Sequence, residues 1–447
     1  MQIIRHYALK TALASVLLLT PLLAFSPTVV NSQVSAQVDP DLLYEHVEYL
    51  AKIPRPPATE TEFAAGVYIE ITLRSYGYQT KLQPFTYYSY RKPTTLSLQV
   101  EGVPGVTWSL HGFTYAPNGI ASGMVVACGE GTAADFQQTD VQGKIALVKR
   151  GSLPYSEKVR QAAAAGAAGL IIQNDRDQMW KGSLGAPLDM AVPVVGISKS
   201  QGELLRAKMN QGGAMATMKV DGALTLRHTS YSILANRPAT SDNRGQVVLL
   251  AARHDSLANS QGADQGASGV AVMLEAARIL AEQPSDTDIQ LVSFGASTAG
   301  NQGARSFVKS LGEREKSKIV AAIVLDALGK KDAGQLVATS NGGAERLPVK
   351  LIQEAGVQVI SGSDTAVFGS TQILFGSDVP TAFLTRQPGK GQQPDTPESV
   401  SREHLAEATQ ALLDAVSPIT DPQSPAYPKP VHDNLPEWKD SLDEEVQ

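Results

Sequence analysis

The sequence predicts an α/β fold with a mostly parallel central sheet flanked by helices, and a small α/β domain inserted into it. Apolar strands alternate with helices after residue 225, and strands that are apolar on both faces in such a pattern are typical of parallel sheets. We expect the strands at 247–252, 288–294 and 319–325, and the helices at 269–281 and 303–311. A Gly- and Ala-rich stretch before residue 222 interrupts the pattern and indicates the inserted domain.

The first 36 residues have the features of a secretory signal peptide. Arg5 and Lys10 precede an apolar run over 11–30, and Val-Ser-Ala at 34–36 provides small or modest side chains at the cleavage position. We expect cleavage after Ala36, with an uncleaved anchor as the alternative. No later apolar run reaches the ~20 residues that a membrane span requires. The expected product is therefore secreted, either extracellular or cell-wall-associated.

Two amphipathic helices are expected at the start of the mature chain, over 39–50 and 60–74. Apolar residues recur there at helical spacing, and Gly77 follows the second helix as a C-cap. Residues 78–87 and 94–100 alternate or cluster β-forming residues, which predicts strands. The Gly and Pro residues just beyond them mark a change of structural unit.

The inserted stretch contains a compact strand, helix and strand pattern. Gly-Lys-Ile-Ala-Leu-Val-Lys-Arg-Gly at 143–151 precedes an alanine-rich helix over 157–169, and Leu-Ile-Ile-Gln-Asn at 170–174 follows. Two buried strands around a closely packed helix make a small α/β unit. This run resembles the protease-associated domain, which implies a lid or docking surface without catalytic residues. Trp180 is expected to pack a loop of this domain, with contact to a ligand as the alternative.

Composition excludes several classes of function. The formal net charge is -6 and no block of basic residues is present, so nothing supplies the cationic surface that nucleic acid or anionic lipid requires. Cys128 is the only cysteine, which rules out an intrachain disulfide and a cysteine-based zinc site. We expect Cys128 to be a small buried residue in a strand.

The chemistry of an open α/β sheet lies at the carboxyl ends of its strands, which directs attention to the residues after 252, 294 and 325. These segments, together with Pro-Arg-Pro-Pro at 54–57 and the inserted domain, resemble in their order the co-catalytic zinc aminopeptidases of the bacterial leucyl aminopeptidase type. The resemblance covers about residues 39–416. It implies a site with two zinc ions, five protein ligands and a glutamate base.

The resemblance also implies a division of the chain into five parts. They are a signal peptide at 1–36, a first part of the peptidase-like domain at 37–104, the protease-associated domain at 105–222, a second part of the peptidase-like domain at 223–416, and a flexible tail at 417–447. The tail contains six prolines and ends in acidic residues, as non-core segments often do.

Four of the five implied ligand positions hold residues unlike those of the family. Each is identified from a motif: Ala-Arg-His-Asp-Ser at 252–256, Gly-Ala-Asp-Gln-Gly-Ala-Ser-Gly at 262–269, Gly-Ala-Ser-Thr-Ala-Gly at 295–300 and Pro-Asp-Thr-Pro at 394–397. The replacements for His, Asp, Glu and His are, in order, Arg253, Gln265, Thr298 and Asp395. Only Asp326, in Leu-Asp-Ala-Leu-Gly at 325–329, fits the pattern. A neutral amide at the bridging position cannot hold two dications.

The catalytic base is replaced as well. Ser297 stands where the family has the glutamate that activates water, and a hydroxyl does not deprotonate water near neutral pH. Loss of a positioned base costs roughly 10²–10⁴ in rate. Asp255 matches the carboxylate that orients a histidine ligand in the family. The motif at 370–375, Ser-Thr-Gln-Ile-Leu-Phe, lacks the Asp-His pair of the corresponding loop.

The remaining charges suggest their own arrangement. We hypothesise that Arg253 pairs with Asp326, with Asp395 as a further partner, because a guanidinium fork can bond two carboxylates. The alternative is a solvated surface arginine. His254 and Asp264 are alternative metal ligands. His254, however, is one residue from the ligand position, which turns a strand side chain to the opposite face, and Asp264 is also suited to a loop or helix cap.

The sequence therefore predicts a secreted, non-catalytic relative that requires no metal and binds peptide, glycan or a partner protein. The transferrin-receptor ectodomain is a precedent for loss of metals in this superfamily. The alternative is an active metallo-aminopeptidase with a rearranged zinc site, since three protein ligands suffice for a catalytic zinc; the candidates are His254, Asp255, Asp264, Asp326 and Asp395. A serine hydrolase using Ser297 and His254 lacks the expected Gly-x-Ser-x-Gly elbow.

Overall fold

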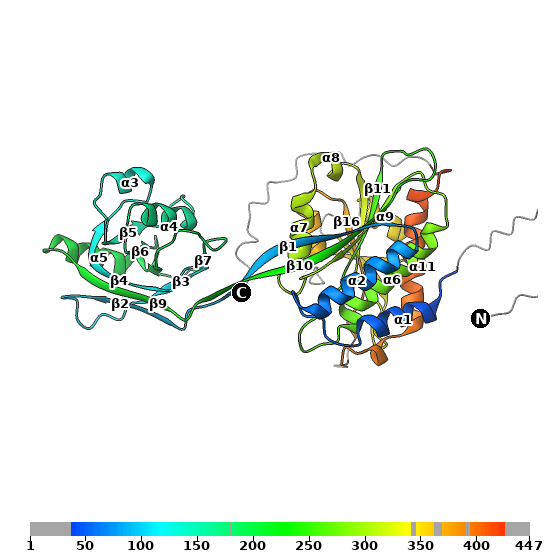
Figure 1. Cartoon of the computed structure of the whole chain (residues 1–447), viewed down its shortest axis with the longest axis horizontal. Coiled ribbons are helices and arrows are strands. Elements are labelled where there is room, and N and C mark those ends of the chain that lie inside the picture. Colours follow the sequence, from blue (N-terminus) through cyan, green and yellow to red (C-terminus); the bar gives the residue numbers. More distant parts are fainter. Residues whose placement is uncertain are drawn as a thin grey trace, which may run out of the picture. The chain divides into compact units, whose positions relative to one another are not determined.

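The computed structural model describes residues 37–178, 180–340, 346–361, 369–389, 391 and 394–424. The expected signal peptide at 1–36 and most of the expected tail, residues 425–447, lie outside the described residues. The described part contains two mixed sheets of eight strands each, and helices pack against both (Figure 1).

The first sheet is parallel at its centre and carries antiparallel strands beside it. Strands β12, β11, β13 and β16 run parallel, and β14 and β15 form a further parallel pair. The pairs β1–β10, β10–β12 and β14–β16 are antiparallel. In spatial order the strands are β1 Gln79–Arg91, β10 Leu224–Arg237, β12 Asp288–Phe294, β11 Val247–Arg253, β13 Ile319–Leu325, β16 Thr381–Arg386, β14 Leu336–Ser340 and β15 Gln358–Ser361.

Helices cover this sheet. One group of helices in contact consists of α1, α2, α6 and α11. Within this group, the apolar residues of α6 pack on β11 and β13. In a second group, Phe307 of α7 and Leu374 of α10 join Leu249 and Ala251 of β11 in one apolar cluster. The helices are α1 Pro40–Leu50, α2 Glu60–Ser75, α6 Gly269–Ala281, α7 Gln302–Ser310, α8 Glu313–Lys316, α9 Leu347–Glu354, α10 Ser370–Phe375 and α11 Arg402–Thr420.

The second sheet belongs to the inserted domain, and an apolar core lies on each of its faces. Its strands in spatial order are β2 Thr95–Val100, β9 Met215–Asp221, β4 Gly119–Ala127, β5 Ile145–Lys149, β6 Gly169–Gln173, β8 Val194–Ile197, β3 His111–Thr114 and β7 Gly182–Ser183. Its helices are α3 Ala133–Gln137, α4 Tyr155–Ala164 and α5 Lys199–Asn210.

Two residues of the inserted domain, Cys128 and Trp180, had a packing role expected from the sequence. Cys128 is a free cysteine and is buried, as expected, although β4 ends one residue before it at Ala127. The ring of Trp180 stacks on His111 with 4.9 Å between centroids and meets Phe113 edge-on. These contacts agree with the packing role expected for Trp180.

Two elements cross the domain limits expected from the sequence. Strand β2 lies before residue 105 yet pairs with β9 from Thr95 to Val100, so the second sheet begins ten residues earlier. Helix α11 continues to Thr420, past the limit at 416, because Ile419 is buried and its carbonyl accepts the hydroxyl of Thr287 at 2.9 Å. Residues 417–420 therefore belong to the helix and not to a flexible tail. In both cases long-range pairing overrides the local Gly and Pro signals.

The register of the parallel strands determines where the site lies. Arg253 at the end of β11 pairs with Phe294 at the end of β12, and Ala252 pairs with Leu325 at the end of β13. The three strands thus end together, and the loops that follow them meet at one edge of the sheet. No helix in the described part of the chain is long and apolar enough to cross a membrane.

Candidate functional site

Tight turns bring the loops of the site together at this edge. The turn of π-helix η1, Ala263–Ser268, contains Gly266 at φ 109°, where a side chain would also approach the backbone oxygen of Asp255 to 3.0 Å. Ala296, Asn301 and Ala327 also have positive φ angles of 49° to 57°. Left-handed backbone at non-glycine residues is uncommon and is often found at functional sites.

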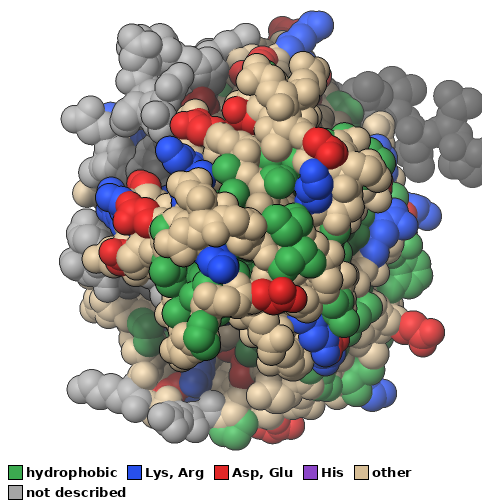
Figure 2. Space-filling view, turned by 90° about the vertical axis from the view of Figure 1, so that its left-hand side faces the viewer, with side chains coloured by type: hydrophobic (Ala, Val, Ile, Leu, Met, Phe, Trp, Pro, Cys, Tyr) green, Lys and Arg blue, Asp and Glu red, His purple; other side chains and the backbone are tan. Residues whose placement is uncertain are grey.

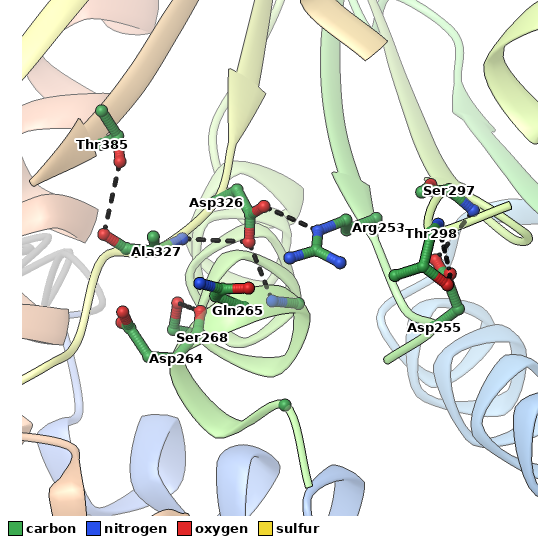
Figure 3. Close-up of polar contacts among 12 residues, drawn as sticks. Arg253, Asp255, Asp264, Gln265, Ser268, Ser297, Thr298, Asp326, Ala327 and Thr385 are labelled. Atoms are coloured by element: carbon green, nitrogen blue, oxygen red, sulfur yellow. Dashed lines mark hydrogen bonds and ion pairs between the residues drawn. The ribbon is translucent and has the colours of Figure 1, made fainter. Parts of the chain in front are cut away.

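Arg253 and Asp326 form an ion pair at the centre of the site (Figure 3). Arg253 Nε donates to Asp326 Oδ2 at 2.6 Å, and Asp326 Oδ1 accepts the backbone N–H groups of Gly266 and Ala327 at 2.8 and 3.0 Å. Burial acts to lower the pKa of Arg253, but Asp326 and the nearby carboxylates outweigh it and raise this pKa. The hypothesised pair is confirmed, and Arg253, with 17% of its side chain exposed, is not a solvated surface residue.

Asp395 does not join this pair. Its carboxylate accepts the backbone N–H groups of Asp264 at 2.6 Å and Gln265 at 3.3 Å, together with the hydroxyl of Ser260 at 3.4 Å. The expectation that Asp395 is a further partner of Arg253 is therefore wrong: the carboxylate instead satisfies the unpaired N–H groups at the start of η1. Gln265 itself is exposed at the cavity.

Asp264 is buried and held by the loop after β13. Its Oδ1 accepts the backbone N–H groups of Gly329 and Lys330 at 2.8 and 3.0 Å. Burial raises the pKa of Asp264 to about 6, although these two bonds favour the charged form. Asp264 therefore joins η1 to the loop after β13, which agrees with the loop role considered for it from the sequence. Its carboxylate is held by the backbone and is not free to bind a metal ion.

Asp255 lies on the other side of Arg253 and binds the loop after β12. Its two oxygens accept the backbone N–H of Ser297 at 3.0 Å, the backbone N–H of Thr298 at 2.7 Å and the hydroxyl of Thr298 at 2.7 Å (Figure 3). The Thr298 side chain at the implied ligand position is thus engaged by Asp255. Ser297 Oγ is buried and has no hydrogen-bond partner among the described residues.

His254 is buried away from these groups. Its Nδ1 lies 2.9 Å from Ser293 Oγ in the neighbouring strand, and burial lowers its pKa to about 4. His254 bonds to Ser293 and not to Ser297, so the described residues do not form the Ser297 and His254 pair considered for a serine hydrolase.

Arg55 and Glu62 are buried charged residues that the sequence patterns did not single out as site residues. Arg55 donates to the backbone oxygens of Leu50, His254, Gln261 and Gly262, and burial lowers its pKa to about 10. Glu62 accepts the backbone N–H groups of Ala58 and Ala296 and the hydroxyl of Ser230, and burial raises its pKa to about 7. Both hold the loops of the site from α2 and the segment before it.

A cavity of about 840 Å³ opens beside the ion pair. Its lining includes Arg253, Asp264, Gln265, Ser297 and Asp326. Of the replaced ligand and base positions, three therefore face this space, whereas Thr298 and Asp395 do not line it. Its remaining walls come from β13, β14, β16 and the segments around Ser370 and Gln387.

The residues at this site do not fit the two zinc ions that the family resemblance implies. A zinc ligand needs a free lone pair on nitrogen, sulfur or an ionised oxygen, whereas Arg253 carries a permanent positive charge and Gln265 is neutral. The carboxylates of Asp255, Asp326 and Asp395 are each engaged through both oxygens. The described residues bring together no group of three or more His, Cys, Asp or Glu side chains suited to a metal ion.

The comparisons with known proteins agree with the fold. Residues 233–389 match the model of Peptidase family M28, and residues 121–205 match the PA domain. A solved aminopeptidase from Aneurinibacillus sp. strain AM-1 is 30% identical, with a TM-score of 0.57 over 89% of this chain and 98% of that chain. The chain therefore belongs to peptidase family M28, the family of zinc aminopeptidases, and carries an inserted PA domain.

Two further relatives come from Bacillus subtilis. The zinc aminopeptidase BSAP is 25% identical, with a TM-score of 0.52 over 87% of this chain and 97% of that chain. Aminopeptidase YwaD is 36% identical over 202 residues, which are 45% of this chain and 43% of YwaD. The match thus spans less than half the length of this curated relative. The predicted α/β fold with an inserted PA domain is confirmed.

Proposed function

We propose that this protein is a secreted, non-catalytic member of family M28 whose cleft binds a peptide or a partner protein. The observation that carries the proposal is the 2.6 Å bond between Arg253 and Asp326. It places a permanent cation, bonded to the one retained ligand residue, at the carboxyl edge of the sheet. A dication beside a guanidinium would meet like-charge repulsion.

The replacement of the base supports the same proposal. Ser297 offers a neutral hydroxyl at the base position, and its Oγ has no partner in the described part of the chain that would accept its proton. Asp255, a carboxylate that matches the family pattern and lies next to Ser297, accepts hydrogen bonds from the backbone of Ser297 and of Thr298. Removal of a positioned general base lowers a rate by roughly 10²–10⁴ even where the other groups remain.

A binding role is supported by the cavity and by the surface. A volume of about 840 Å³ falls within the ~300–1,000 Å³ typical of sites for small ligands and side chains. On the face drawn in Figure 2, basic and acidic side chains are interspersed among apolar and neutral ones. This face therefore offers no extended basic surface for a nucleic acid, in line with the net charge of -6. Secretion is proposed from the sequence of residues 1–36.

The alternative is an active metallo-aminopeptidase with a rearranged site. It is favoured by the names of the relatives, which are aminopeptidases. Three ligands for one zinc would have to come from residues that now hold loops in place, such as Asp255, Asp264 and Asp326. Binding would cost the hydrogen bonds that these carboxylates accept from the backbone.

Turnover distinguishes the two functions. The mature chain is mixed with leucine p-nitroanilide and added zinc or cobalt, with BSAP as a positive control. We expect no release of p-nitroaniline above the buffer rate, and R253H alone is expected to remain inactive because Gln265 and Ser297 are unchanged. Release by the wild-type chain that a chelator abolishes would contradict the proposal.

A gain-of-function variant tests the assignment of the replaced positions. The variant R253H/Q265D/S297E/T298E/D395H restores the family residue at the four replaced ligand positions and at the base position. We expect it to bind zinc more tightly than the wild-type chain does. Equal zinc binding by the two proteins would show that these are not the positions where the site was lost.

A further inference from the structure

We propose that the cavity is a binding site for a carboxylate carried on an apolar body, held by Arg253, Ser297 and Thr371. This inference rests on the proposed function, because it requires that the guanidinium of Arg253 is present at the site in place of metal. It names the chemistry of the ligand that the non-catalytic cleft binds.

The first observation is the unused part of the Arg253 guanidinium. Arg253 lines the cavity, and only its Nε takes part in the bond to Asp326. The two Nη atoms donate none of the hydrogen bonds found within the described residues, and in Figure 3 the dashed line from Arg253 to Asp326 starts at Nε alone. Two adjacent N–H groups of a guanidinium match the two oxygens of a carboxylate in geometry and charge.

The second observation is a pair of buried hydroxyl groups without partners. Ser297 and Thr371 are 8% and 1% exposed, and both line the cavity beside Arg253. Neither Oγ of Ser297 nor Oγ1 of Thr371 has a hydrogen-bond partner among the described residues. A buried polar atom without a partner costs free energy, so an acceptor within the cavity would remove that cost at two points.

The third observation is the balance of charge around the cavity. Three cationic side chains line it, Arg253, Lys330 and Arg386, against two carboxylates, Asp264 and Asp326. Asp326 is already paired with Arg253, and Asp264 accepts two backbone N–H groups. Arg386 is in turn paired with Glu407, and Lys330 lies 3.9 Å from Asp332. The cationic donors of the lining without a partner among the described residues are therefore the two Nη atoms of Arg253, which suit an anion more than the amino terminus of a peptide.

The rest of the lining indicates the body of the ligand. Val324, Val337, Phe383 and Pro388 add apolar walls to the same cavity. Apolar walls with a few placed polar groups are typical of sites for small ligands. The shared chemistry is a carboxylate on an apolar side chain, whose source is either the C-terminus of a peptide or a free acylated amino acid.

Calorimetric titration of the full mature chain tests this inference with matched probes. N-acetyl-L-leucine carries the carboxylate, N-acetyl-L-leucinamide replaces it with a neutral amide, and L-leucinamide carries a free amino group. We expect the acid to bind at least about tenfold more tightly than either amide, because a charge-assisted bidentate bond is lost in both. Tighter binding of acetyl-Ala-Ala-Leu than of N-acetyl-L-leucine would identify peptide C-termini as the source, and weaker binding would identify free acids.

Variants locate the binding to the named groups. We expect S297A and T371V each to lower the affinity for N-acetyl-L-leucine by about fivefold or more without lowering the melting temperature, since neither hydroxyl bonds to a described residue. S232A and T339V are matched controls, because Ser232 and Thr339 also carry buried hydroxyls without partners in the described part of the chain but do not line the cavity. They are expected to leave the affinity unchanged. R253K keeps the charge but loses the fork, and about a tenfold loss is expected.

The outcomes separate this inference from the proposed function. Equal binding of acid and amide, no binding of the acid, or equal effects of the cavity variants and their controls would each overturn the carboxylate site alone. Stoichiometric zinc together with hydrolysis of leucine p-nitroanilide would overturn the proposed function, and the inference would fail with it.

Discussion

The two sides of Arg253 differ in how their carboxylates are satisfied. On one side, Asp255 accepts two backbone N–H groups and the hydroxyl of Thr298, while Arg55 and Glu62 hold the surrounding loops through backbone atoms. On the other side, Asp326 shares its charge with a cation and faces an open cavity. The first side is a closed network of polar groups, and the second is an ion pair next to unused donors.

This difference separates the support of the site from its chemistry. Loops around Asp255 need buried charges to satisfy their backbone groups, so a change there carries a large structural cost. The cavity side carries Arg253 and Gln265 where the family resemblance implies metal ligands, and Ser297 where it implies the base, while the sheet beneath it keeps its register. A fold can therefore keep the frame of a catalytic site after the chemical groups are replaced.

The largest effect is expected on the Asp255 side, from loss of Arg55. R55M leaves four backbone oxygens without their donor, in a region where Arg55 is 2% exposed. We expect a loss of about 4 kcal/mol in the free energy of unfolding, or failure to accumulate as folded protein. Arg305 donates to one backbone oxygen, that of Gly300, so R305M is a matched control with an expected loss of about 1 kcal/mol or less. Similar losses for R55M and R305M would show that the network around Asp255 contributes no more to the free energy of unfolding than a single hydrogen bond to the backbone does.

The ion pair on the cavity side is expected to give a smaller effect. R253M leaves Asp326 without its cation, and we expect a loss of about 3 kcal/mol in the free energy of unfolding. In R253M/D326N, the neutral amide oxygen can still accept from the backbone of Gly266 and Ala327, so more than half of this loss is expected to be recovered. Chemical denaturation measures both, with R402M at an exposed pair as the control. A double variant no more stable than R253M would contradict the unpaired charge of Asp326 as the cause of the loss.

The smallest effect is expected from Glu62, on the Asp255 side, as a pH dependence of the free energy of unfolding. Burial raises the pKa of Glu62 to about 7, above its usual value of 4.5. The folded chain thus holds this proton more tightly than the unfolded chain, and the contribution of Glu62 to stability falls as pH rises from about 4.5 to 7. E62Q lacks this term, so we expect the wild-type advantage in stability over E62Q to shrink by about 2 kcal/mol between pH 5 and pH 8.

Melting curves recorded at several pH values across this range provide the measurement. E48Q serves as the control, since Glu48 is exposed on α1 and is expected to show no such change relative to the wild-type chain. A wild-type advantage over E62Q that stays constant or grows with pH would be inconsistent with a raised pKa for Glu62.

The sequence predicted the groups at the strand ends because these depend on local order. Apolar runs placed β11, β12 and β13, and aligned motifs then identified Arg253 and Asp326 as neighbours at one edge. The roles of Arg55 and Glu62 could not be predicted in this way. Their partners are backbone atoms up to 234 residues away, which leave no trace in side-chain patterns. A charged residue at a buried position of the α2 helical pattern, such as Glu62, was the one available signal.

The alignment of motifs also predicted the wrong partner for Asp395. Its motif placed it at a ligand position and favoured contact with Arg253, whereas its carboxylate satisfies the first N–H groups of η1. Backbone donors at a helix start attract carboxylates whatever the ancestral role of the position was. The orphaned hydroxyls of Ser297 and Thr371 are likewise visible only once side chains are placed in the cavity.

The central claim is that a guanidinium bonded to Asp326 stands where a zinc aminopeptidase holds its metal ions. The zinc content of the mature chain, measured by mass spectrometry after equilibration with excess zinc and removal of unbound metal, tests it most directly. We predict well under one zinc ion per chain, with R253M/D326N no higher. Two zinc ions retained per wild-type chain would contradict the claim.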